Sequence, residues 1–444
     1  MGPRLRRGRL PESEGETRMK MLNRMIGALK KAPGVDAWLV TETKTESRQA
    51  FYVLQKLETT RLAETTEYAV TVYHRFSADG NAYLGSSQFA FSRPLKAKEM
   101  EEKIAEAVFA ASFIKNPAFE LVEGTGRKRT WKQPPFPEEP FAMLDRIANL
   151  FFAASRPSVR FNALELFANR TTLRTVNSKG VDYAKTLNAV EIEAIPSCDG
   201  EKQKVELYKH YTHDKIDYAV IAREAKEALL DVEARNEAGK VGEPKTMDVL
   251  LRDENVKEFF ETLVEDYSYP AVFRQMTDKK IGDPIQTEVK GDFVTVGMKP
   301  SCPADAFDRD GVLLQPVTIV ENGILKDFYG SNQYARYLGM EPHGNYGFLS
   351  VPKGTASAAS LLKRPHLEII ALSGIQIDMY TGYIGGEVRL GLLSDGKETR
   401  PVSGFSFSGN LAKCLSDVRL SKEGVRLAGY EGPRYLRLPA MEIL

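Results

Sequence analysis

The C-terminal half of the chain consists mostly of short β-forming runs interrupted by glycine. A single amphipathic helix is expected among them, over residues 254–266. Short strands with frequent turns are typical of β-rich domains, so residues 241–444 are predicted to form one. The clearest of these runs cover residues 311–314, 319–323 and 367–372.

The N-terminal half instead mixes helix and strand patterns. Residues 68–76 are rich in β-branched and aromatic side chains, and a turn at 77–81 leads into a second strand, which predicts a β-hairpin. Residues 95–115 repeat apolar positions at intervals of three and four, which predicts an amphipathic helix. The expected fold class is therefore α+β, with a mixed α/β N-terminal half followed by a β-rich C-terminal domain.

A proline-rich connector at residues 131–140 suggests a subdomain boundary, because proline removes a backbone donor and restricts the residue before it. Beyond it, a helix is expected at 140–155 and another from Ile216 to Arg235, capped by Asp214. Strands are expected at 158–166, 170–176 and 187–195. The predicted organisation is a disordered extension over 1–20, an α+β subdomain over 21–130, a second over 141–240 ending in a linking helix, and the C-terminal domain.

Charge and cysteine content exclude several classes of protein. The formal net charge is +1 and no basic cluster with interleaved aromatics is present, so neither nucleic acid nor a membrane surface is an expected partner. No apolar run approaches the roughly 18 residues that would span a bilayer. The three cysteines Cys198, Cys302 and Cys414 show no CxxC spacing, which favours a reducing, cytoplasmic setting over a disulfide framework.

Motifs for metal or nucleotide chemistry are missing from the sequence. None of the five histidines is followed by glutamate in a zinc-binding helical pattern, and neither GxxxxGK nor a strand-linked GxGxxG occurs. His210 and His213 form the only close histidine pair. Their polar segment precedes a helix, so a structural role is favoured over a metal site.

Several short motifs, taken in order, resemble the TldD/PmbA family, also called modulators of DNA gyrase. Each motif is weak alone, and their collinear order carries the resemblance. The motifs are FDRDG at 307–311, IVENGILKDF at 319–328, SNQYARYLG at 331–339, TGYIGGE at 381–387, PVSGFSFSGNL at 401–411, and the earlier VNSKG turn at 176–180.

The resemblance implies that this chain is on the PmbA, or TldE-like, side of the family. In the catalytic branch a helix carries HExxxH, which supplies two zinc ligands and a general base. Here Glu261, Thr262 and Asp266 occupy the corresponding positions. The resemblance therefore implies no catalytic residue, metal ligand or cofactor in this chain, and zinc in a catalytic partner.

By the same resemblance, the expected function is that of a non-catalytic subunit in a metallopeptidase complex acting on unfolded or precursor peptides. The expected partners are a TldD-like HExxxH subunit and a peptide, within a homodimer or hetero-oligomer. The candidate lining of a peptide path consists of Tyr380, Thr381, Gly382, Tyr383, Gly385 and Gly386, where Tyr383 and the two glycines depart from the family's common form.

Two alternatives remain open at this point. One is a stand-alone binding or scaffold protein of the same fold with no role in a peptidase. The other is an active hydrolase with relocated ligands, using His210, His213 and a carboxylate.

Overall fold

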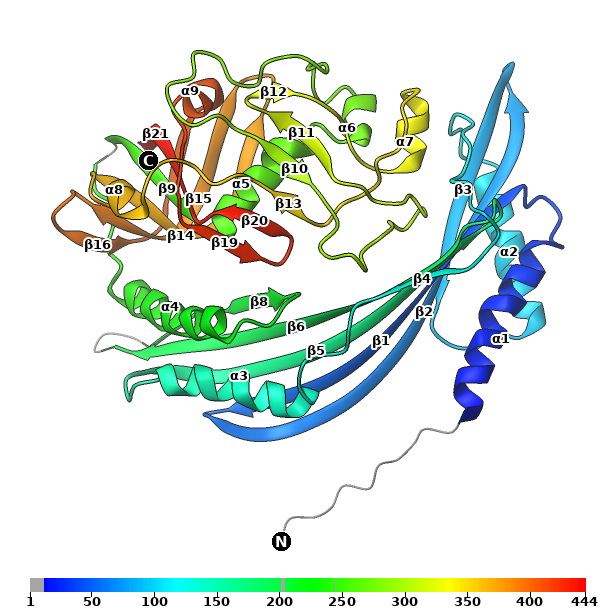
Figure 1. The fold of residues 1–444 in the computed structure, drawn as a ribbon, viewed down its shortest axis with the longest axis horizontal. Helices are drawn as coiled ribbons and strands as arrows, with labels where there is room; N and C mark the ends of the chain where they lie inside the picture. The colour runs from blue at the N-terminus through cyan, green and yellow to red at the C-terminus, as the bar shows by residue number, and fades with distance from the viewer. Residues whose placement is uncertain (1–11, 201–203, 244) are drawn as a thin grey trace, which may run out of the picture.

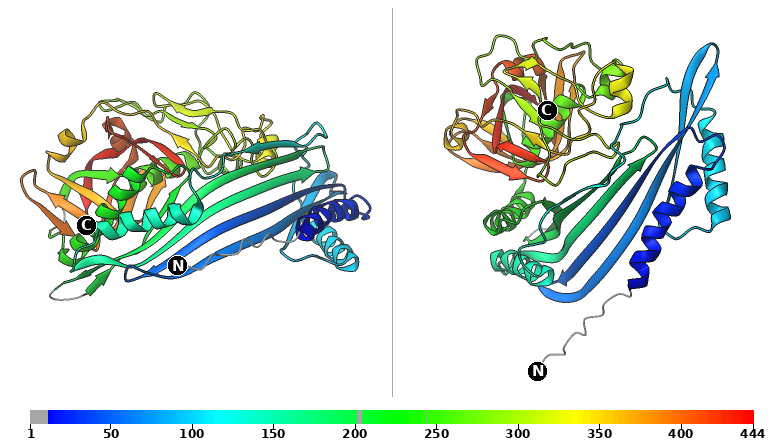
Figure 2. Two further views of the ribbon diagram at one scale, coloured as in Figure 1. Left: turned by 60° about the horizontal axis from the view of Figure 1, so that its bottom comes forward. Right: turned by 45° about the vertical axis from the view of Figure 1, so that its right-hand side comes forward.

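In the computed structural model of the chain, the backbone is described for residues 12–200, 204–243 and 245–444. Figures 1 and 2 show a long curved sheet made by the N-terminal half and a compact C-terminal domain beside it. Of the predicted extension over 1–20, residues 1–11 lie outside the described residues, and helix α1 begins at Glu12.

One eight-stranded sheet runs through the whole N-terminal half, in the order β3-β2-β1-β5-β6-β4 with β7 and β8 also pairing with β6. Strands from both predicted N-terminal subdomains share this sheet, while the division into those subdomains stays a prediction. The strands are β1 (Ala37–Val53), β2 (Lys56–Ala78), β3 (Asn81–Phe91), β4 (Arg129–Lys132), β5 (Val159–Asn177), β6 (Asp182–Asp199), β7 (Lys204–Glu206) and β8 (Lys209–His213).

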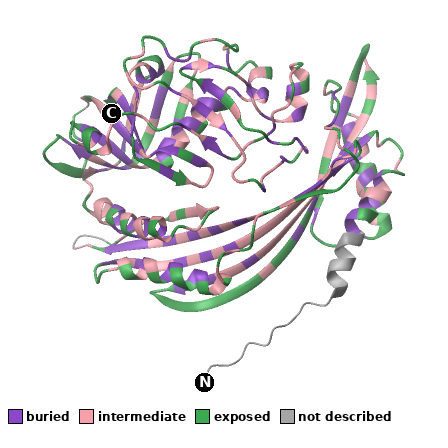
Figure 3. Ribbon diagram, viewed as in Figure 1, coloured by how far each residue is buried: buried purple, intermediate pink, exposed green. Residues whose placement is uncertain are grey.

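Four helices cover the two ends of this sheet (Figure 1). Helices α1 (Glu12–Leu29) and α2 (Ala97–Ala111) pack over one end, in a core that includes Trp38 and Val70. Helices α3 (Pro140–Ala154) and α4 (Tyr218–Glu237) form a second core at the other end. Between the two cores the strands are only partly buried, as the pink bands in Figure 3 show.

The C-terminal domain is built from two sheets, which confirms the predicted β-rich fold. The larger has the order β14-β9-β21-β17-β15-β16, and pairing of β14 with β15 closes it into a barrel; β18 also pairs with β21. Its strands are β9 (Lys245–Arg252), β14 (His366–Asp378), β15 (Tyr383–Ser394), β16 (Thr399–Val402), β17 (Phe405–Asn410), β18 (Arg419–Leu420) and β21 (Tyr435–Ile443).

The smaller sheet has the order β12-β11-β10-β13-β20-β19, and α5 packs between the two sheets against β9, β13 and β14. Its strands are β10 (Val296–Met298), β11 (Val317–Glu321), β12 (Ile324–Leu325), β13 (Leu349–Ser350), β19 (Gly424–Leu427) and β20 (Tyr430–Pro433). The helices are α5 (Glu254–Glu265), α6 (Tyr269–Phe273), α7 (Asn332–Tyr337), α8 (Ala358–Leu362) and α9 (Leu411–Ser416).

Three local predictions are wrong. The run at residues 311–314 forms no strand, because it folds back on its own loop with a single isolated bridge between Leu313 and Phe307. The strands expected at 158–166 and 170–176 are one continuous strand, because the polar residues between them pair across the sheet; Arg170, for example, donates to Asn188 on β6. Helix α4 is capped by Asp217, whose carboxylate accepts from the backbone N–H of Ala219 at 2.9 Å. Asp214 instead pairs with Arg426 of the C-terminal domain at 2.8 Å.

The C-terminal domain rests on the sheet through a loop around residue 307. Phe307 is fully buried against Tyr183 of β6, and Lys185 forms an ion pair with Asp305 at 2.6 Å. A side chain at Gly311 would meet Val181 at 2.8 Å, so the loop and the sheet are in close contact there. Among the described helices, none is long and apolar enough to cross a membrane.

Candidate functional site

Helix α5 carries the positions that the resemblance singled out, and its sequence divides it into two faces. Val256, Phe259, Phe260, Leu263 and Val264 are fully buried in the core between the two C-terminal sheets. Their spacing of three and four residues produces one apolar stripe. The helix is therefore held in place by packing along this stripe, and its other face is left for polar residues.

The three degenerate motif positions lie on or after that polar face. Glu261 is exposed, Thr262 is half-buried, and Asp266 follows the last helical residue. Desolvation raises the pKa of Glu261, Lys257 lowers it, and Glu254 and Glu258 add to the rise. Desolvation also raises the pKa of Asp266, with contributions from Glu265 and Asp378. The carboxylates thus have acidic neighbours.

These residues do not fit a zinc ion. Zinc sites use cysteine sulfur, histidine nitrogen or carboxylate oxygen in a tetrahedral arrangement, and only the last of these donors is present here. Residues five apart on a regular α-helix point about 140° away from each other, so Glu261 and Asp266 do not converge. Across the described residues, no group of three or more histidine, cysteine, aspartate or glutamate side chains is placed to hold a metal ion.

The histidine pair is also not brought together. His210 and His213 lie on strand β8, where residues three apart point to opposite faces. His210 is paired in register with Glu193, whereas the ring of His213 is buried 3.0 Å from Glu224 on helix α4. This geometry gives the relocated-ligand alternative no support.

The hairpin between β14 and β15 lies beside the C-terminal end of α5. The side chain of Glu258 accepts a hydrogen bond from the backbone N–H of Ile375 at 2.9 Å, which ties the helix to β14. At the turn, Asp378 accepts from the N–H groups of Tyr380 and Thr381, and these bonds lower its pKa. The structure therefore places the degenerate motif and the candidate peptide-path segment next to each other.

Part of that segment lines an open hollow of about 670 Å³. Thr381, Gly382 and Tyr383 form one wall, while Tyr380 turns away and donates to the backbone carbonyl of Gln275. Asp378 also lines the hollow on the hairpin side. The rest of the lining, which sequence reasoning missed, comes from β17, α9 and β21 and includes charges of both signs. It consists of Ser408, Gly409, Asn410, Lys413, Ala440 and Glu442.

The two glycines of the segment have a packing role. A Cβ at Gly385 would lie 2.2 Å from the hydroxyl of Tyr383, so the phenol lies across a position without a side chain. A Cβ at Gly386 would lie 2.9 Å from the carbonyl oxygen of Gly374 and 3.0 Å from the ring of Phe407. The two glycines, which depart from the common pattern of the resemblance, therefore allow the close packing within the hairpin.

We expect Gly386→Val to lower the free energy of unfolding by about 1–3 kcal/mol, because the added side chain overpacks the contact between β14, β15 and β17. Urea denaturation followed by far-UV circular dichroism measures the change. Gly347→Ala is the matched control, since a Cβ there meets nothing within 4 Å. Equal stability of both variants would show that the hairpin relaxes without cost.

Strand β15 cannot accept a further strand at this segment. Residues 383–386 pair with β14 on one side and β17 on the other, so both backbone edges are already hydrogen-bonded. Elsewhere, β2 pairs with β3 only from Tyr68 onward, and among the described residues the backbone of Lys56–Ala63 pairs with β1 alone. A further strand could therefore pair with β2, whereas the hairpin could contact a bound chain only through its side chains.

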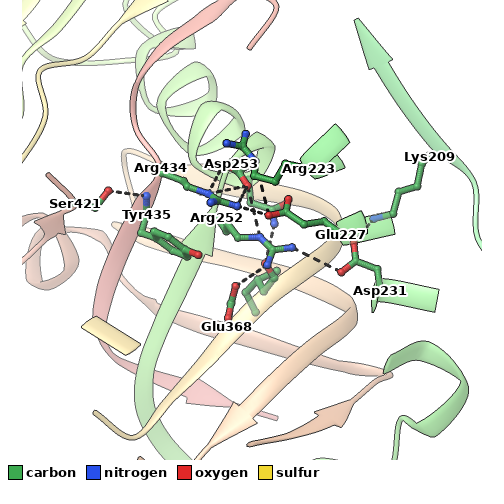
Figure 4. A network of polar contacts seen from close by, with 12 residues as sticks. Lys209, Arg223, Glu227, Asp231, Arg252, Asp253, Glu368, Ser421, Arg434 and Tyr435 are labelled. Carbon is green, nitrogen blue, oxygen red and sulfur yellow. Dashed lines mark hydrogen bonds and ion pairs between the residues drawn. The ribbon is translucent and has the colours of Figure 1, made fainter. Parts of the chain in front are cut away.

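The N-terminal end of α5 is anchored to α4 by a network of charged residues (Figure 4). Arg434 donates to Glu227 of α4 at 2.6 Å and to both carboxylate oxygens of Asp253, the residue before α5. Arg252 pairs with Glu368 at 3.1 Å and approaches Asp231 of α4 at 3.7 Å. This network fixes α5 relative to the N-terminal sheet.

Residues 244–443 match the profile of the PmbA/TldA metallopeptidase C-terminal domain. Solved structures share the arrangement of the whole chain at identities low enough that the likeness concerns the fold alone. They include a candidate modulator of DNA gyrase from Bacteroides thetaiotaomicron (TM-score 0.76, 16% identity, 96% of this chain and 98% of that one). A candidate modulator of a DNA gyrase from Thermotoga maritima (0.72, 15%, 96% and 100%) and TldE from Thermococcus kodakarensis (0.71, 15%, 95% and 99%) are also similar.

Proposed function

The chain belongs to the PmbA/TldD metallopeptidase family, and we propose that it is a non-catalytic subunit of a peptidase complex that processes or degrades unfolded or precursor peptides. The observation that carries the proposal is on helix α5. Its apolar face packs between the two sheets, and the positions to which the resemblance assigns metal ligands and base carry Glu261, Thr262 and Asp266.

The proposed partner is a TldD-like subunit whose own HExxxH helix holds zinc. In such a complex the metal-bound water and the general base belong to that subunit. This chain would contribute walls and positioning groups. The β2 edge at Lys56–Ala63, which pairs with β1 alone among the described residues, offers backbone groups to a strand of a partner or of an extended peptide.

The proposed peptide contact in this chain is the hollow beside the β14–β15 hairpin. Tyr383 is 42% exposed there and offers an aromatic face, and Lys413 and Glu442 offer charges of both signs. Aromatic and charged side chains of this kind bind extended peptides without strand pairing. The segment then acts through its side chains, since its backbone is already paired.

The test is a reconstitution with the full chain. We expect the purified chain alone to leave an unfolded peptide intact, and a mixture with an HExxxH relative from the same genome to form a stable complex that cleaves it. Mass spectrometry of the peptide and elemental analysis of zinc in each subunit provide the readout. A mixture in which the relative's HExxxH glutamate is replaced by glutamine is the control.

Three outcomes distinguish a non-catalytic subunit from an independent peptidase and from a stand-alone binding protein. Cleavage by the complex, with zinc only in the relative, supports the proposal. Stoichiometric zinc and cleavage by this chain alone overturn it. Peptide binding by this chain without any association with the relative also overturns it, in favour of a stand-alone binding or scaffold protein.

A further inference from the structure

A small cavity of about 80 Å³ lies between the N-terminal sheet and the C-terminal domain, apart from the hairpin hollow. Strands β1 and β2 supply one side of it, the connector after α2 the second, and the FDRDG loop with the start of α7 the third. The lining residues are Leu39, Tyr73, Phe119, Leu121, Val122, Asp310, Ser331, Asn332 and Gln333.

Asp310 brings a carboxyl group to this cavity without a cationic partner among the described residues, and burial raises its pKa. One of its carboxylate oxygens accepts from the backbone N–H of Asn332 at 3.1 Å. Within the described chain, no lysine, arginine or histidine forms an ion pair with Asp310. The nearby bases Arg75 and Lys179 are both committed to Glu120, at 3.5 and 3.1 Å. A buried charge that lacks a partner is costly, so this carboxylate is poised to take one.

Asn332 adds a second open acceptor to the cavity. Its side chain is buried, with only 3% of the residue exposed. Its amide nitrogen donates to the carbonyl oxygen of Glu120 at 2.9 Å, which fixes the orientation of the amide. The amide oxygen is then buried with no hydrogen-bond partner in the described structure. An unsatisfied buried acceptor costs about 1–3 kcal/mol, so a donor in the cavity would be favoured.

Asp308 stabilises the loop at 307–311 without pairing with the carboxyl group of Asp310. Its carboxylate accepts from the backbone N–H groups of Asp310, Val312 and Asn345, at 3.0, 2.9 and 3.0 Å. Burial and the charge of Asp310 raise the pKa of Asp308 to about 6. Because its oxygens are occupied by backbone donors, Asp308 braces the loop and leaves Asp310 to face the cavity.

The remaining walls decide between two kinds of cation. A magnesium ion keeps several bound waters, and each of these needs a hydrogen-bond acceptor. Besides Asp310 and Asn332, the side-chain acceptors in the lining are those of Ser331, Gln333 and Tyr73, whereas Leu39, Phe119, Leu121 and Val122 offer none and suit the carbon chain of an organic cation. Tyr73 also presents an aromatic ring, and such rings attract ammonium groups.

We propose that this cavity binds a primary alkylammonium group, such as a lysine side chain or the amino end of a peptide, between the carboxylate of Asp310 and the amide oxygen of Asn332. The assignment to a peptide rests on the proposed function. Binding of the ammonium group itself does not, since it requires neither a partner subunit nor catalysis.

The test is direct titration of the full chain with n-butylammonium chloride by calorimetry, with n-butanol as the neutral probe. We expect saturable binding of the ammonium alone. Asp310→Asn should weaken it about 10- to 100-fold, the worth of one charge-assisted hydrogen bond. Glu123→Gln, which removes an exposed charge close in sequence that does not line the cavity, should leave the affinity unchanged.

A second variant keeps the test informative if Asp310→Asn does not fold. Val122→Phe fills the cavity without removing a polar group, and it should also abolish binding. Nα-acetyl-lysine amide and alanine amide then separate the two sources, since the first offers only a side-chain ammonium and the second only an amino end. Tighter binding of magnesium chloride than of n-butylammonium, or no binding by the native chain, would overturn the proposal.

Discussion

Replacement of Arg434 by methionine is expected to lower the free energy of unfolding by about 2–4 kcal/mol. Methionine keeps much of the length and apolar stem but removes the charge that faces Glu227 and Asp253. Those partners are only 25% and 19% exposed, so losing the arginine leaves two partly buried carboxylates near each other. The expected loss is below the range for fully buried pairs, because water reaches part of this network.

The unfolding curve should also change shape. Arg434 joins the residue before α5 to helix α4, so it couples the C-terminal domain to the N-terminal half. Both tryptophans, Trp38 and Trp131, lie in the N-terminal sheet, whereas circular dichroism reports both parts. In Arg434→Met, urea transitions measured by tryptophan fluorescence and by circular dichroism should separate further than in the native chain.

Arg426→Met provides the matched control for this prediction. Arg426 also crosses between the domains, to Asp214 at 2.8 Å, but its side chain is 36% exposed. Exposed pairs contribute at most about 1 kcal/mol, so this variant should lose little. If the two variants lose equal stability, burial is not what gives the Arg434 network its strength.

The helices were predictable from sequence because their signal is local. The predicted segments at 95–115 and 254–266 became α2 and α5 within a few residues, since an apolar stripe and good helix formers are enough to define them. Strand length was harder to predict. Residues 159–177 form one strand although their middle is polar, because Thr172 and Arg170 find partners on β6 that a local pattern does not reveal.

The candidate sites also differ in whether a local sequence signal marks them. The order of motifs assigned Glu261, Thr262 and Asp266 to the helix predicted at 254–266. The structure confirms that helix, and the correspondence of these residues to a metal motif stays a prediction. The Arg434 network had no local signal, since Arg434 lies 207 residues from Glu227 along the chain. The FDRDG loop was noticed only as a point of resemblance. Its contact with Asn332 and the sheet depends on how the two halves pack.

Phe260→Ala is expected to lower the free energy of unfolding by about 3–5 kcal/mol, which would make it one of the most damaging single changes in the chain. Phe260 is fully buried and packs edge-on against Phe259, with ring centroids 5.2 Å apart. Truncation removes this contact and leaves a cavity that the two flanking sheets cannot close. Urea denaturation followed by circular dichroism measures the loss.

The next residue along the helix supplies the matched control. Glu261→Gln, alone or with Asp266→Asn, should change stability by no more than about 0.5 kcal/mol, because neither carboxylate forms a hydrogen bond or ion pair within the described chain. Desolvation is the largest cause of the raised pKa of both carboxylates, so removing their charge removes a cost of burial, while the attraction between Glu261 and Lys257 is lost. This contrast is expected if α5 contributes to stability only through its apolar face. A loss above about 2 kcal/mol in the double variant would instead show that the polar face of α5 is held by specific contacts.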